Sequence, residues 1–149
     1  MQKMDLTTGY PASVREKLHG VVQLRRAIDK GIAKSQGTEG EYNFDCPMDK
    51  GIFEFLAIDG NALYEKIKSA NDFSEIEAYV KPFVEKKSAA ELEAFNADWL
   101  NDAPAAGSDG EKYLRGMVDA IDPKRTDITT WADMLDFDEK RPVPVKAAV

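Results

Sequence analysis

Apolar residues recur at helical spacing along most of the chain, beginning with one long segment. Ser13 and Glu16 have the spacing of a capping box, which marks a helix start. A Gly-bearing stretch, residues 36–40, ends the segment after Lys34. The apolar side chains between these signals fall on one helix face: Leu18, Val21, Val22, Ile28 and Ile32. This pattern predicts a single helix over residues 13–34.

Start and stop signals predict further helices downstream. Pro47 fits the first turn of a helix that runs to Leu56, and Asn61 can cap a helix through about Ala70. The remaining starts are the capping pairs Asp72/Glu75, Ser88/Glu91 and Ser108/Glu111, with Pro82 a kink or an end in the first of these helices and Pro123 a stop after the last. A last short helix is expected around Trp131, Met134 and Leu135.

These elements predict an all-α fold, a single compact domain of six or seven helices over residues 1–149. Residues 1–12 read as a lead-in and residues 141–149, with two prolines, as an extended tail. Alternation of aromatic and polar residues predicts at most one short extended hairpin near residues 41–46. The best linker candidate is the stretch from Pro104 to Gly107.

Charge and composition narrow the function classes. The net charge is −7 and the pI about 4.8, which disfavours nucleic acid and anionic membranes as partners. Neither a signal peptide nor a membrane span is visible, so a cytoplasmic location is expected. One cysteine excludes an intrachain disulfide, and no metal-ligand or phosphate-loop spacing occurs, so neither metal nor cofactor is predicted. A homodimer is left open.

Two charges interrupt the apolar stripe of the first predicted helix. Arg25 and Asp29 are four residues apart, a spacing at which helical side chains meet. Charges in an apolar stripe must be paired or serve a site, because an unpaired buried charge is costly. The alternatives are a structural ion pair and a ligand or catalytic site.

A second polar cluster runs from Glu41 to Asp49 and includes Tyr42, Asp45 and Cys46. Cys46 precedes a predicted helix start, where the helix dipole favours a thiolate nucleophile. A lone cysteine is more often a small buried apolar residue. A base for it could come from His19, the only histidine, although nothing in the sequence demands that pairing. By contrast, an acidic run near the C-terminus is expected to be a solvated face: Asp133, Asp136, Asp138 and Glu139.

Four stretches resemble a family of uncharacterised bacterial proteins, domain of unknown function 5069. They are Leu-Arg-Arg-Ala-Ile-Asp-Lys at 24–30, Gly-Glu-Tyr at 40–42, Cys-Pro-Met-Asp at 46–49, and the aromatic-rich segment 53–59. The resemblance covers about residues 5–100 and lends no established activity. It implies site importance for the positions that match: Arg26, Asp29, Lys30, Glu41, Tyr42, Cys46, Pro47 and Asp49.

The chain departs from that family pattern at three positions. Arg25 stands where the family has proline, Gln23 where it often has histidine or an apolar residue, and Ile32 where it has arginine. A proline at position 25 implies a helix that begins there, which conflicts with the predicted start at Ser13. The resemblance therefore favours Arg26 over Arg25 as a site residue.

The function expected from these residues is a small enzyme that needs no cofactor (a lyase, isomerase or hydrolase), or a binding domain for a small anionic molecule. Arg25 or Arg26 would hold the anion, with Lys30 and Asp49 beside it. Asp29 or Glu41 would act as base, Tyr42 as acid or hydrogen-bond donor, and Cys46 would line the pocket. The alternatives are a helical interaction or regulatory module and a purely structural cluster.

Overall fold

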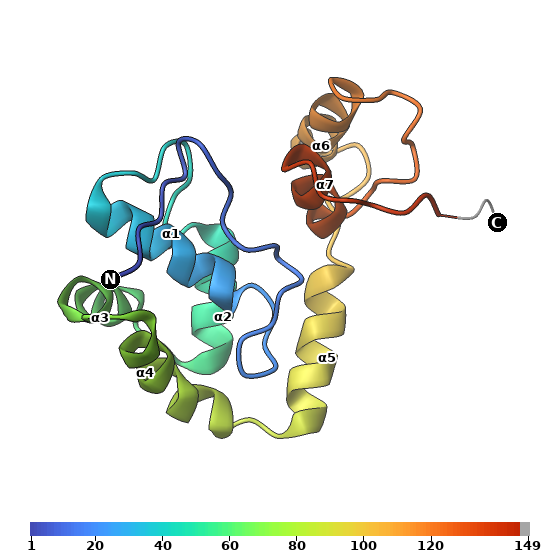
Figure 1. Ribbon diagram of the computed structural model, residues 1–149. Coiled ribbons are helices and arrows are strands. Elements are labelled where there is room, and N and C mark those ends of the chain that lie inside the picture. The colour runs from blue at the N-terminus through green and yellow to red at the C-terminus, as the bar shows by residue number, and fades with distance from the viewer. Residues whose placement is uncertain (147–149) are drawn as a thin grey trace. The chain divides into compact units, whose positions relative to one another are not determined.

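The computed structural model describes residues 1–146, and this part of the chain contains seven α-helices and no strand (Figure 1). The all-α prediction is therefore confirmed. The helices are α1 (Leu24–Gln36), α2 (Pro47–Leu56), α3 (Gly60–Ser69), α4 (Phe73–Glu85), α5 (Ala89–Leu100), α6 (Asp109–Asp119) and α7 (Trp131–Asp138). None of the helices described is long and apolar enough to cross a membrane.

Local capping signals set most helix starts where the sequence predicts them. The hydroxyl of Ser88 accepts the backbone N–H of Glu91, whose carboxylate accepts the N–H of Ser88 in return. Ser108 caps α6 and Asp72 caps α4 by accepting the N–H groups of residues 111 and 75, while the carboxylates of Glu111 and Glu75 accept the N–H of the residue before each cap. For α3 the cap is Asp59 rather than Asn61, because the Asp59 carboxylate accepts the N–H groups of residues 61 and 62.

The prediction of one helix over residues 13–34 is wrong. The helix α1 begins at Leu24, near the position that the family resemblance implies. Ahead of it, Leu18 and Val21 exchange two backbone hydrogen bonds of 3.0 and 3.1 Å around a tight turn. His19 and Gly20 form the turn with φ of 51° and 83°, the left-handed region in which histidine is tolerated and glycine is favoured. The apolar residues before Leu24 have helical spacing although they lie in a turn, because the side chains of this turn are buried as those of a helix face would be.

The short hairpin expected near residues 41–46 is not formed. Tyr42 donates its N–H to the carbonyl of Glu39 in a turn, and Asp45 has a φ of 61°. The N–H of Asp45 donates to the carboxylate of Asp49, at 3.0 Å, instead of to a partner strand. Further along, Pro82 lies inside α4 and does not end it.

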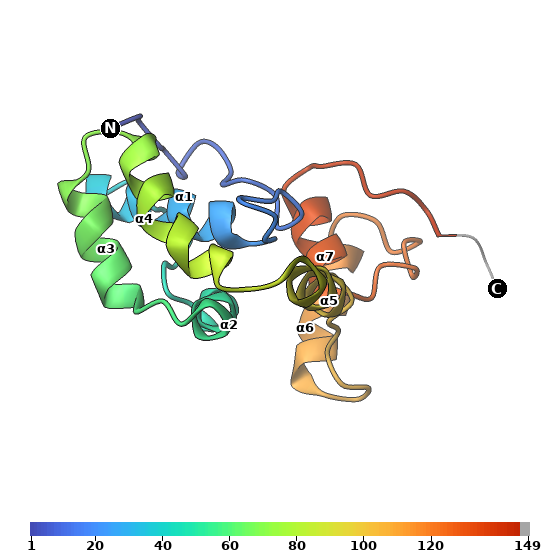
Figure 2. The same ribbon diagram turned by 90° about the horizontal axis from the view of Figure 1, so that it is seen from below.

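The chain divides into two compact units, Met1–Ala94 and Phe95–Val149. The boundary falls inside α5 and not at the predicted linker of residues 104–107. The single-domain organisation stays a prediction. Within the first unit, α1 packs against α2 and α3, and α4 packs against α3, as Figures 1 and 2 show.

Each unit has its own buried apolar residues. In the first unit, the largest fully buried side chains come from α1, α2, α3 and α4 and include Leu24, Ile28, Ile52, Leu63 and Ile76. In the second unit, the core is Leu114, Val118, Ile128 and Met134.

The predicted lead-in, residues 1–12, and the described part of the predicted tail, residues 141–146, contain no helix. The lead-in is tied to the end of α1, because the N–H of Leu6 donates to the carbonyl of Thr38 at 2.8 Å. Residues 141–146 of the predicted tail have no regular structure, and residues 147–149 lie outside the described part.

Candidate functional site

Two of the predicted residues fasten α1 to the segment that leads into it. Arg26 donates from Nη1 to the carbonyl of Ala12, at 3.1 Å, and the N–H of Ala12 donates to Oδ2 of Asp29, at 2.9 Å. Both side chains are buried, and the guanidinium of Arg26 lies 5.6 Å from the centre of the Tyr42 ring. Arg26 and Asp29 therefore both bind the backbone of Ala12, and Arg26 also contacts Tyr42.

A buried ion pair joins α1 to the first turn of α2. Lys30 Nζ lies 2.9 Å from Oδ2 of Asp49, with both side chains almost fully buried. The same carboxylate accepts the side-chain amide of Gln23 and the N–H of Asp45, each at 3.0 Å. Such a pair is tolerated in the interior only because hydrogen bonds complete its solvation. Lys30 and Asp49 thus fix the relation of the two helices.

Cys46 stands at the N-terminal cap of α2, immediately before Pro47. Its Sγ accepts a hydrogen bond from Lys30 Nζ at 3.3 Å, and the side chain is half-buried. His19 lies elsewhere, beside Glu77 at 3.7 Å between Nε2 and Oε1. The two residues considered as a nucleophile and its base therefore have different neighbours.

Glu41 does not join the cluster. Its residue is exposed in a turn, and within residues 1–146 its carboxylate makes no hydrogen bond or ion pair. Sequence proximity to Tyr42 placed it among the candidates, but successive residues of a turn point in different directions.

Arg25 differs from Arg26, Asp29 and Lys30 of α1 because it reaches the surface. Its Nε donates to Oδ1 of Asp29 at 3.0 Å, and its side chain is 28% exposed. The guanidinium carbon lies 4.1 Å from the centre of the Phe73 ring at the start of α4. Within the described residues, Nη1 and Nη2 have no hydrogen-bond partner. Arg25 therefore presents an unused edge while Asp29 and Phe73 hold its other atoms.

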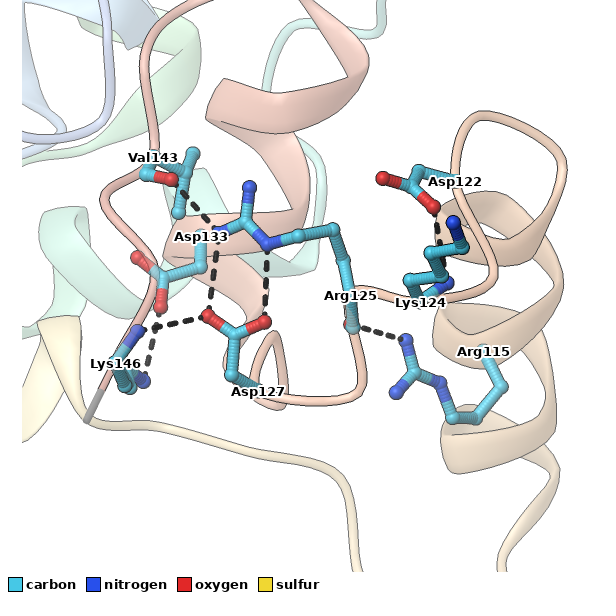
Figure 3. Close-up of polar contacts among 8 residues, drawn as sticks. All are labelled: Arg115, Asp122, Lys124, Arg125, Asp127, Asp133, Val143 and Lys146. Atoms are coloured by element: carbon cyan, nitrogen blue, oxygen red, sulfur yellow. Dashed lines mark hydrogen bonds and ion pairs between the residues drawn. The ribbon is translucent and has the colours of Figure 1, made fainter. Parts of the chain in front are cut away.

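A second polar network, in the C-terminal unit, was missed by the sequence reasoning (Figure 3). Arg125 donates from Nε and Nη2 to the two carboxylate oxygens of Asp127, at 3.0 and 3.2 Å, and from Nη2 to the carbonyl of Val143, at 2.7 Å. The N–H of Lys146 also donates to Asp127, and its Nζ lies 3.1 Å from Asp133. These contacts hold residues 143–146 against the loop before α7.

Hydrogen bonds in this network shift the pKa values of Asp127 and Arg125. The Arg125 side chain, followed by the N–H of Lys146, lowers the pKa of Asp127 to about 2. The hydrogen bond to Asp127 in turn raises the pKa of Arg125.

The acidic run near the C-terminus is not the solvated face that was expected. Asp133, Asp136 and Glu139 are buried, and Asp138 is exposed. Burial is possible because cations reach these carboxylates: Lys146 contacts Asp133, while Arg141 contacts Asp136 and Glu139. The basic residues that flank the run in the sequence are the signal that could have predicted these buried ion pairs.

Comparison with known proteins places the chain in a family without adding an activity. No curated protein matches it. A family model described as a domain of unknown function, DUF5069, matches residues 8–141. This match takes in both units and reaches well past residue 100, where the sequence resemblance ended. The chain belongs to the DUF5069 family.

Proposed function

We propose that the protein binds a small molecule bearing a carboxylate or phosphate group, and that Arg25 holds that group. The observation that supports this most is the free outer edge of the Arg25 guanidinium, whose Nε is anchored on Asp29. A guanidinium offers parallel N–H donors that match the two oxygens of a carboxylate or phosphate. The remaining predicted residues then serve as the frame of the site.

Pre-organisation is the physical reason to choose Arg25. A free arginine side chain gives up roughly 0.5–1.5 kcal/mol of rotamer entropy when a ligand immobilises it. Here the ion pair with Asp29 and the stacking on Phe73 have already restricted the chain. Arg26 lacks this freedom to bind, because it is buried at 3% exposure and donates to Ala12. The geometry therefore favours Arg25 over Arg26, the reverse of the ranking that the family pattern implied.

In this proposal, other candidate residues have positioning roles that the same contacts support. Asp29 orients Arg25, and the buried pair of Lys30 and Asp49 keeps α1 in register with α2. In this proposal the protein acts in the cytoplasm as a binding domain or as an enzyme that needs no cofactor. Tyr42 and Cys46 remain proposed lining groups, and Glu41 has the weakest support.

The test is a thermal-stability screen of the whole chain against phosphate, acetate and small dicarboxylates. A ligand that binds only the folded state raises Tm with its concentration. We expect at least one of these anions to stabilise the protein but not Arg25→Gln. Arg25→Lys should retain less than a tenth of the affinity, because it keeps the charge but loses the fork. Arg125→Gln, a change in the second unit, is the matched control and should keep the full response.

If none of the anions stabilises the protein, or if Arg25→Gln responds as strongly as the unchanged protein, the proposal fails. A helical interaction module would then be the better description of this protein.

A further inference from the structure

The only histidine of the chain lies on the tip of a tight turn, next to the element that supports Arg25. His19 and Gly20 are the central residues of the turn closed by Leu18 and Val21. A non-glycine residue at a φ of 51° carries backbone strain, and such strain gathers at functional positions. The turn directs the imidazole towards α4, where Nε2 lies 3.7 Å from Oε1 of Glu77.

This histidine and Arg25 both contact the helix α4. Arg25 stacks on Phe73, and His19 faces Glu77. Phe73 and Glu77 are four residues apart on α4, so their side chains share a face with Cβ atoms about 5–6 Å apart. The group proposed to bind the anion and the imidazole near Glu77 therefore contact neighbouring positions on one face of α4.

The two ring nitrogens of His19 have different surroundings. Nε2 is buried and has no hydrogen-bond partner within the described residues, and the nearest carboxylate is that of Glu77. The side chain as a whole is 21% exposed although Nε2 is buried, so solvent reaches other atoms of the side chain. We take Nδ1 to be one of them. A carboxylate that faces one imidazole nitrogen fixes the proton there and leaves the lone pair on the other.

We infer that His19 is a proton acceptor for the molecule that Arg25 holds, with Glu77 as its positioning residue. This inference rests on the proposed function. The substrate class is a small carboxylic acid with a C–H bond next to a carbonyl or carboxyl group. Nδ1 takes the proton, the electron pair of the C–H bond stays on the substrate as an enolate, and Glu77 stabilises the imidazolium. Return of the proton from Nδ1 to the same carbon completes a hydrogen exchange without a cofactor.

The distance of 3.7 Å exceeds that of a hydrogen bond. Catalytic hydrogen bonds are often long before the substrate binds and shorten in the complex. The proton-acceptor role requires the Glu77 side chain, which is 42% exposed, to close this gap when the substrate binds. Glu77→Gln should therefore weaken proton transfer without loss of the fold.

The test uses nuclear magnetic resonance of the whole chain, in which a single histidine gives a single set of ring signals. Long-range nitrogen–proton spectra of the neutral ring should show the Nε2–H tautomer, and Glu77→Gln should shift the population towards Nδ1–H. In heavy water, a panel of dicarboxylates and keto acids should include one whose C–H exchanges for deuterium. His19→Asn, which tolerates a positive φ, should abolish exchange while Arg25-dependent anion binding is kept.

The outcomes separate the two proposals. An anion that binds through Arg25, together with an Nδ1–H tautomer or with exchange unchanged in His19→Asn, overturns the proton-acceptor role and leaves the proposed function standing. Absence of Arg25-dependent binding overturns both.

Discussion

Four of the five charged side chains of α1 lie near the proposed site and differ in what surrounds them, and this difference decides which of them can bind a ligand. Arg26, Asp29 and Lys30 are buried, while Arg25 reaches solvent. Their helical spacing made contact between Arg25 and Asp29 predictable. Which arginine keeps free donors was not predictable, because that depends on Ala12 and Phe73, which are distant from α1 in sequence.

The buried pair of Lys30 and Asp49 should dominate the local stability. Lys30→Met leaves the Asp49 carboxylate buried without its cation, which we expect to cost about 3–5 kcal/mol of unfolding free energy. The matched control is Lys50→Met, which removes a pair with Asp45 whose lysine is 61% exposed. That change should cost about 1 kcal/mol or less in urea unfolding. Equal losses in the two variants would show that burial does not set the strength of these pairs.

Asp29 should contribute both to the fold and to the site. Asn at this position loses the negative charge that Arg25 Nε and the N–H of Ala12 contact. We expect Asp29→Asn to remain folded with a loss of about 1–3 kcal/mol, and to weaken anion binding more than tenfold. Thermal melts with and without the anion measure both effects. Unchanged affinity would mean that Asp29 does not position Arg25.

At the level of elements, prediction succeeded where the signal is local. Pro47 and the pairs Ser88/Glu91 and Ser108/Glu111 mark helix starts that the structure confirms, because a cap involves atoms three residues apart. It failed over residues 13–23, where buried apolar side chains of a turn imitate helical periodicity. His19, Gly20 and Gln23 all have a positive φ there, and hydrophobic periodicity carries no information about that backbone conformation.

The packing of α1 on α3 depends on one glycine. A Cβ at Gly31 would lie 2.6 Å from Cδ1 of Ile67 and 3.0 Å from the Phe44 ring. Gly31→Ala should therefore destabilise the protein by about 1–3 kcal/mol. At Gly116 of α6 a Cβ would meet nothing within 4 Å, so Gly116→Ala should stabilise it by about 0.5–1 kcal/mol. Chemical unfolding of both variants checks the prediction. The change in unfolding free energy must have opposite signs in the two variants.

At the level of the whole molecule, the two units can be followed separately. Both tryptophans, Trp99 and Trp131, belong to the second unit, so their fluorescence reports on that unit. The Arg125–Asp127 network that holds residues 143–146 lies in the same unit. Sequence reasoning could not find this network, because three of its contacts join residues 13, 18 and 19 positions apart.

Acid should weaken the second unit through Asp127. Its pKa is about 2 in the folded chain against an ordinary 3.8, so the folded state holds this proton less tightly. The stabilisation is complete above the ordinary pKa and is lost as the pH falls towards about 2. Urea midpoints followed by tryptophan fluorescence should therefore drop over this range, and Asp127→Asn should lack that part of the drop. The same slope in both proteins would contradict the assignment to Asp127.

The most direct measurement of the central claim is the Nε–Hε resonance of Arg25 during titration with the anion that stabilises the protein. Assignment follows from its loss in Arg25→Gln. We predict that this resonance shifts saturably with the affinity seen in thermal melts, while the resonance of Arg125 stays in place. A stabilising anion that leaves the Arg25 resonance unmoved would show that the ligand binds elsewhere and would contradict the account.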